Sequence, residues 1–108
     1  MPETKQSIYV IRPTRVLMLR EGRTADETEA LVKHFEYLEG LAENGVVLLA
    51  GRTQENDEST FGIVIVEADS EEAARAVMEN DPAVVGGVMQ PRLHPFSIAV
   101  RGIGQKPG

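Results

Sequence analysis

The sequence predicts an α+β fold with one antiparallel β-sheet and two helices, in the order β-α-β-β-α-β. Two observations predict it: helix-capping signals stand at Thr24 and near Ser70, and short apolar runs precede, separate and follow the helical segments. The 108 residues, 42% hydrophobic and 26% charged, suit one globular domain with one core. We expect one domain over residues 1–108, with its core at about 7–101 and a flexible tail at 102–108.

The first part of the chain favours strand structure. The runs at residues 7–11 and 15–19 are apolar and contain β-branched residues. Pro13 interrupts them, because proline lacks the N–H group that a strand ladder requires. The pattern leaves open which half is the regular strand.

A long helix is expected to follow. Thr24 and Glu27 have the spacing of a capping box, in which each side chain accepts a hydrogen bond from the other's backbone. Gly45 is placed to end the helix in a left-handed conformation. The predicted buried stripe has helical spacing and consists of Leu31, Phe35, Leu38 and Ala42.

The rest of the chain continues the alternation. We expect the second helix to begin at Asp69 or Ser70 and to stop near Asn80, because the residue before Pro82 disfavours helical dihedral angles. The other expected elements are a strand buried on both faces at residues 46–50, a polar loop at 51–60, a strand at 61–66 and a last strand at 93–100.

This order implies a ferredoxin-like arrangement, an antiparallel sheet with both helices on one face. The other face would then lie open, although its strands are apolar. A second copy of the sheet is the simplest cover, so we expect a homodimer that packs sheet to sheet, as in a dimeric α/β barrel.

Six short motifs, in order from about Tyr9 to Val100, resemble those of the YCII-related proteins. They are His34-Phe35-Glu36-Tyr37-Leu38 with Gly45, Leu48-Leu49-Ala50-Gly51, Phe61-Gly62-Ile63, Ser70-Glu71-Glu72-Ala73, Asp81-Pro82-Ala83-Val84 and His94-Pro95-Phe96. The sequence departs from the family at Arg52, where proline is common. The resemblance therefore does not predict the shape or charge of the rim of the family's pocket at this position.

The resemblance implies a ferredoxin-like α+β dimer, akin to dimeric α/β barrels such as muconolactone isomerase. It also implies a His–Asp pair in a cleft, and the two positions that match are His34 and Asp81. Some relatives resemble dehydrochlorinases of aromatic degradation.

His34 and Asp81 are the candidate catalytic residues, as a general base and the carboxylate that orients it. Each has a simpler alternative. His34 flanks the apolar stripe and fits a boundary histidine packed between core and solvent. Asp81 precedes Pro82 and fits a local cap of a short helical segment, a role compatible with bonding to His34.

Four further residues are candidates for substrate binding. The Tyr37 hydroxyl can donate to a substrate oxygen, Arg15 or Arg52 can bind a carboxylate with two hydrogen bonds, and His94 can act as a second acid. Packing is the alternative for Tyr37, and a solvated or half-exposed position is the alternative for the other three.

Composition argues against several classes of function. The formal net charge is −6, which disfavours nucleic-acid binding. With no cysteine, disulfides and thiolate metal sites are excluded, and no histidine spacing typical of a metal site occurs. We expect no metal and no cofactor. No apolar run has membrane-spanning length and none follows the N-terminus as a secretory core, so we expect a cytoplasmic protein that binds no membrane.

Two hypotheses for function follow. In the first, the protein is a small cofactor-free lyase or isomerase, of dehydrochlorinase type if the resemblance extends that far, that uses the His–Asp pair on a small aromatic or lactone-type substrate. In the second, the dimer binds a small ligand or a partner protein without catalysis. An open pocket at His34 favours the first hypothesis, and a sealed His34 favours the second.

Overall fold

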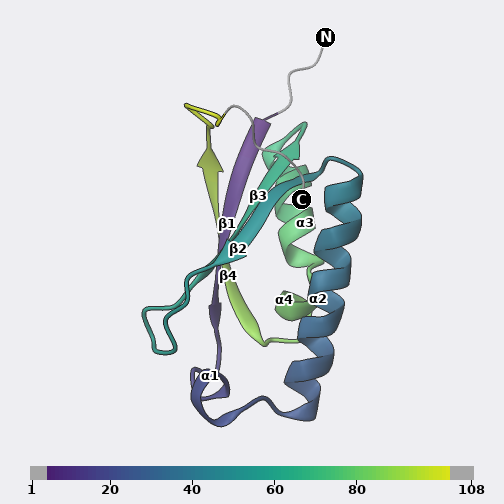
Figure 1. The fold of residues 1–108 in the computed structure, drawn as a ribbon. Coiled ribbons are helices and arrows are strands. Elements are labelled where there is room, and N and C mark those ends of the chain that lie inside the picture. Colours follow the sequence, from purple (N-terminus) through teal and green to yellow (C-terminus); the bar gives the residue numbers. More distant parts are fainter. Residues whose placement is uncertain (1–4, 103–108) are drawn as a thin grey trace.

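The computed structural model describes residues 5–102. Four strands form one antiparallel sheet in the order β2-β3-β1-β4. The helices α2, α3 and α4 lie together on one side of it, and the short α1 lies beyond the end of β1 (Figure 1). The elements are β1 (Lys5–Pro13), α1 (Met18–Glu21), α2 (Ala25–Glu43), β2 (Val47–Arg52), β3 (Gly62–Ala68), α3 (Glu71–Glu79), α4 (Pro82–Val85) and β4 (Met89–Phe96). The α+β, ferredoxin-like prediction is therefore confirmed.

The long helix α2 begins and ends as the sequence predicts. The Thr24 N–H donates to Glu27 Oε1 at 2.8 Å, and the Glu27 N–H donates to Thr24 Oγ1 at 3.1 Å, which completes the capping box. Gly45 lies just past the helix with a φ of 78°, a conformation that glycine adopts without steric cost. Ser70 caps α3, and Asn80 lies at its C-terminal end.

The predicted strand at residues 15–19 is wrong. After Pro13 the chain turns, because the Met18 N–H donates to Arg15 O and the Leu19 N–H to Val16 O, and the short α1 follows. The regular strand is therefore the first half, residues 5–13.

The last strand also differs from its prediction. It is β4, residues 89–96, rather than 93–100. Phe96 pairs with Gln6, near the beginning of β1, so the chain beyond it has little strand left to pair with. Most of the expected tail, residues 103–108, lies outside the described residues.

The core lies between the sheet and the helices. On β1, Ser7, Tyr9 and Ile11 are buried on the helix side, while Ile8 and Val10 alternate onto the other face. A main cluster joins β1, β2, β3, α2 and α3, and a smaller one joins α1, α2 and α4.

Two burial predictions are corrected. On α2 the buried residues are Glu27, Leu31, His34 and Leu38, whereas Phe35 is 55% exposed and Ala42 is also exposed. The predicted strand at 46–50 is not buried on both faces, because β2 lies at the sheet edge and Leu49 is 56% exposed. Both deviations occur beside the cavity described below.

Candidate functional site

Asp81 is the centre of the site. It precedes Pro82 and caps α4, where its Oδ1 accepts the Ala83 N–H at 3.0 Å. This is the local role expected of an Asp-Pro sequence. The side chain is fully buried, with 0% exposure, so its charge must be balanced by hydrogen-bond donors.

His34 supplies one of those donors. It lies on the buried face of α2, and its Nδ1 is 2.6 Å from Asp81 Oδ1. The two residues are 47 positions apart in the chain and meet because α2 packs against α4. The structure thus brings the candidate base and its orienting carboxylate together.

Tyr9 supplies the other side-chain donor. Its hydroxyl donates to Asp81 Oδ2 at 2.7 Å from the helix-facing side of β1. Burial, followed by the charge of Asp81, raises the pKa of Tyr9 far above its ordinary value, so the hydroxyl keeps its proton.

The donors fix the state of the imidazole. The Tyr9 hydroxyl and the Ala83 N–H both donate to Asp81, which suits an ionised carboxylate because that group only accepts. Beside an ionised Asp81, the neutral form of the His34 imidazole carries its proton on Nδ1, 2.6 Å from Oδ1, and holds a lone pair on Nε2. This is the tautomer that a general base requires.

A cavity of about 330 Å³ lies between α2 and the β2–β3 side of the sheet, and His34 lines it. Since Nδ1 is bonded to Asp81, Nε2 is the ring nitrogen left without a bond to that carboxylate. The walls are largely apolar, and their members include Leu31, Phe35, Leu38, Val47, Leu49, Val64 and Met89. Such walls suit a small ring compound.

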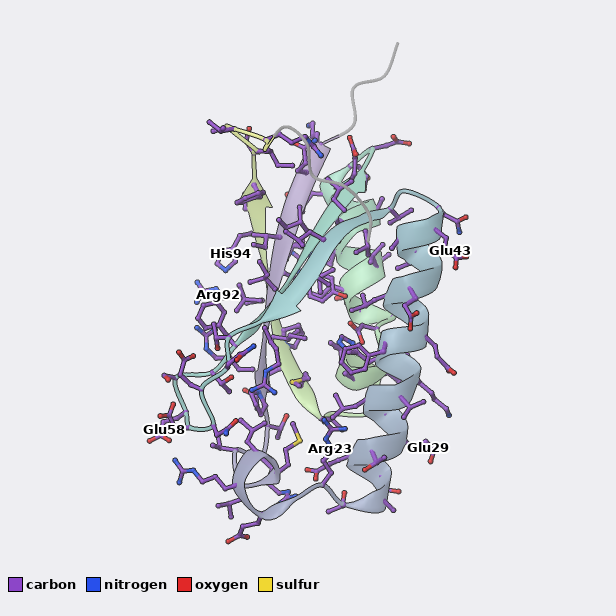
Figure 2. The ribbon with its side chains drawn as sticks, in the orientation of Figure 1. Arg23, Glu29, Glu43, Glu58, Arg92 and His94 are labelled. Atoms are coloured by element: carbon purple, nitrogen blue, oxygen red, sulfur yellow. The ribbon has the colours of Figure 1, made fainter. Side chains whose placement is uncertain are left out.

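Four other polar residues line the cavity: Arg23, Glu39, Arg52 and Thr60. The Arg52 Nε donates to Thr53 O at 2.7 Å and its Nη2 to Glu55 O at 3.2 Å. Thr60 Oγ1 lies 3.3 Å from Thr53 Oγ1. Within residues 5–102, no hydrogen bond or ion pair occupies the side chain of Arg23 or Glu39. Figure 2 shows Arg23 on the sheet side of α2, whereas Glu29 and Glu43 point away from the sheet.

The four predicted substrate-binding residues do not gather at this cavity. Arg52 lines it, but Tyr37 does not, and the Tyr37 hydroxyl donates to Val77 O at 2.8 Å. His94 lies on β4 opposite Ile8, on the sheet face away from the helices (Figure 2).

Arg15 is engaged elsewhere. Its Nε and Nη2 donate to the two carboxylate oxygens of Glu27 at 2.9 and 2.6 Å, and Nη2 also donates to Gly22 O. The Arg15 guanidinium, with the backbone N–H of Thr24, lowers the pKa of Glu27 to about 2. Arg15 therefore ties the segment after β1 to the beginning of α2.

Sequence reasoning missed two residues of the site. Tyr9 could have been found, because it alternates with Ser7 and Ile11 on one face of a strand, and a buried tyrosine hydroxyl needs a partner. Arg23 carried no distinguishing signal beside Arg12, Arg15 and Arg20.

Within the described residues, no group of three or more acidic or histidine side chains is arranged to hold a metal ion. No helix among residues 5–102 is both long enough and apolar enough to cross a membrane.

Comparison with known proteins identifies the family of the chain. Residues 14–96 match the YCII-related domain. A solved structure of similar fold is 5-chloro-2-hydroxyhydroquinone dehydrochlorinase from Burkholderia phenoliruptrix AC1100, in complex with 2,5-dihydroxybenzoquinone. It is 21% identical with a TM-score of 0.59, covering 84% of this chain and 93% of its own. No curated protein matches the chain. The family match spans most of the sequence, and the chain belongs to the YCII-related family.

Proposed function

We propose that this protein is a small lyase or isomerase in which His34 Nε2 is the general base for a ring-shaped substrate. The observation that carries the proposal is the His34–Asp81 pair beside an apolar cavity that His34 lines, because the pair leaves Nε2 as the ring nitrogen not bonded to Asp81. Asp81 acts through His34: it holds the imidazole in position and stabilises the cation that forms when Nε2 takes a proton.

The chemistry needs no transfer of electrons to a cofactor. Nε2 removes a proton from a hydroxyl or from a carbon next to a carbonyl group. In an isomerisation the imidazolium returns the proton to another atom of the substrate. In a dehydrochlorination, one hydroxyl proton is first transferred to the chlorine-bearing ring carbon, which becomes saturated while the hydroxyl carbon becomes a carbonyl. Nε2 then removes the proton of a second hydroxyl. The electron pair of that O–H bond forms a second ring carbonyl, the displaced C=C pair forms a new double bond to the chlorine-bearing carbon, and chloride leaves with the C–Cl pair.

Two observations support a ring compound as substrate. The cavity volume of about 330 Å³ is at the lower end of small-molecule sites, and its walls are mainly apolar. The structural neighbour is named a dehydrochlorinase of a chlorinated ring compound and holds a dihydroxybenzoquinone. Non-catalytic binding of a small ligand is the alternative that the experiment below separates.

Chloride release from 5-chloro-2-hydroxyhydroquinone tests the dehydrochlorinase form of the proposal. His34→Gln should reduce the rate by about 10²–10⁴-fold, the usual contribution of a positioned base. His94→Gln is the matched control, because it removes the other histidine from the opposite sheet face, and it should leave the rate unchanged. Equal rates for the parent and His34→Gln would contradict the proposal.

A binding measurement identifies the non-catalytic alternative. 2,5-Dihydroxybenzoquinone should shift the NMR signals of the His34 ring and leave those of His94 in place. Binding at His34 without chloride release or proton exchange in any ring compound tested would favour a ligand-binding protein.

A further inference from the structure

Arg23 is the cation of the cavity that has no protein partner in the described residues. It directly precedes Thr24, the N-cap of α2, and lines the same cavity as His34. Its side chain lies on the sheet side of the helix in Figure 2. A guanidinium carries five N–H donors in a fixed planar arrangement, so Arg23 offers donors that the fold itself leaves unused.

The other arginines nearby are already engaged. Arg12 lies over the Phe61 ring, with its guanidinium carbon 5.5 Å from the ring centroid. Arg15 binds Glu27, and Arg20 donates to Asn56 O and lies near Glu58. In the cavity itself, the Arg52 guanidinium donates to two backbone carbonyls of its own loop. Arg23 is thus set apart from arginines that stabilise loops and helix ends.

The charge distribution of the protein favours a role for Arg23 in binding an anion. The chain has a formal net charge of −6, and one of its carboxylates, the buried Asp81, lies next to the base. An anionic ligand approaching His34 needs a local positive charge to offset both. Arg23 supplies it at the end of the cavity nearest the beginning of α2, whereas Glu39 lies farther along the helix.

We propose that Arg23 recognises an acidic group of the ligand, so that the cavity takes ring compounds bearing a carboxylate or an ionised ring hydroxyl. That such compounds are substrates, and not only ligands, rests on the proposed function. The recognition itself can be measured by binding alone. Arg23 would hold the acidic group through charge-assisted hydrogen bonds while the ring lies against the apolar wall below His34.

The experiment compares an anionic ring with its neutral counterpart by calorimetry and NMR titration. Benzoate and benzamide form the carboxylate arm, and 2,5-dihydroxybenzoquinone and its dimethyl ether form the ionised-hydroxyl arm. The variants are Arg23→Gln, which removes the charge, and Arg23→Lys, which keeps it without the planar donor array. Arg75→Gln is the matched control, because Arg75 is exposed on α3, away from the cavity and from the open sheet face, and its loss changes the net charge equally.

The parent protein should bind the anion of at least one arm about tenfold or more tightly than its neutral partner. That preference should fall to about one in Arg23→Gln, survive in part in Arg23→Lys, and persist in Arg75→Gln. The pair of compounds that shows this preference identifies the acidic group that Arg23 binds. Equal affinity for anion and neutral compound in the parent, or an unchanged preference in a folded Arg23→Gln, would overturn the proposal. Failure of the parent to bind either anion at millimolar concentration would overturn it as well.

Failure of this inference is distinguishable from failure of the proposed function. If His34→Gln abolishes turnover while Arg23→Gln leaves the preference for anions intact, the result supports His34 as the base and contradicts the role of Arg23. If Arg23 controls the preference but His34→Gln leaves every rate unchanged, anion recognition stands and the catalytic proposal falls.

Discussion

Replacing Tyr9 by phenylalanine tests whether Asp81 is a buried, charged carboxylate. The change removes one oxygen and keeps the ring, so the packing of the main core cluster is preserved. It leaves Asp81 Oδ2 without the donor that lies 2.7 Å away in the parent. A hydrogen bond to a charged group contributes about 1.5–3 kcal/mol, so we expect Tyr9→Phe to lower the free energy of unfolding by that amount.

Tyr37→Phe is the matched control, because it deletes the same atom from a neutral hydrogen bond. The Tyr37 hydroxyl donates to the backbone carbonyl of Val77 at 2.8 Å and is only partly buried. Bonds between neutral groups contribute about 0.5–1.5 kcal/mol, so this variant should lose about 1 kcal/mol less than Tyr9→Phe.

Urea unfolding at one fixed protein concentration measures both variants. Fixing the concentration keeps the contribution of any self-association comparable between the parent and the variants. The urea midpoint should fall more for Tyr9→Phe than for Tyr37→Phe, with the slope of the transition unchanged in both. An equal or smaller loss for Tyr9→Phe would refute the assignment of a charged Asp81 that depends on the Tyr9 hydroxyl.

Three further predictions concern the rest of the fold. Its partners lower the Glu27 pKa from 4.5 to about 2, so Glu27 stabilises the folded state above about pH 4.5 and this contribution is lost as the pH falls toward 2. The free energy of unfolding of Glu27→Gln should therefore fall less steeply between about pH 4.5 and 2 than that of the parent. An identical pH slope in both proteins would contradict this. Leu38→Ala should lower the free energy of unfolding by about 2–5 kcal/mol, measured with urea. Val32→Ala, at an exposed position of the same helix, should lower it by less than about 0.5 kcal/mol. Similar losses in the two variants would show that the buried face is wrongly assigned. The half-exposed apolar residues on the open sheet face predict a homodimer. Light scattering at micromolar concentration should therefore give a molar mass of twice 11.8 kDa. The mass of a monomer would argue against sheet-to-sheet assembly.

Local signals account for the elements that were predicted correctly. The capping box of Thr24 and Glu27 and the glycine at position 45 act within one or two helical turns, so the sequence window contains all their partners. The strand ends depend on partners far away in the chain. Phe96 ends β4 because of where β1 begins, which no local pattern reveals.

The burial of apolar residues was predicted less well for a related reason. Phe35 and Leu49 have the pattern of core residues, yet they line a cavity that the rest of the fold leaves open. A periodic pattern shows which face of an element is apolar, and it does not show whether that face is filled by protein or left for a ligand.

The site shows the same division. The meeting of His34 and Asp81 followed from the resemblance together with a topology that puts both helices on one sheet face, and the structure confirms that contact. Tyr37 was named and Tyr9 was missed, because a side chain's role depends on strand register and helix rotation to within one residue. Their hydroxyls bond to Val77 O and Asp81 respectively.

The protonation pattern of the His34 ring tests most directly whether the pair forms an oriented base. Two-bond and three-bond ¹H–¹⁵N correlation spectra at mildly alkaline pH distinguish a protonated from an unprotonated ring nitrogen. His94 is the one other histidine in the chain, so His94→Gln assigns the signals. We expect neutral His34 to carry its proton on Nδ1, with Nε2 unprotonated, and to lose this strong preference in Asp81→Asn. A His34 ring protonated on Nε2 in the parent protein would contradict the role of Asp81 and of the base.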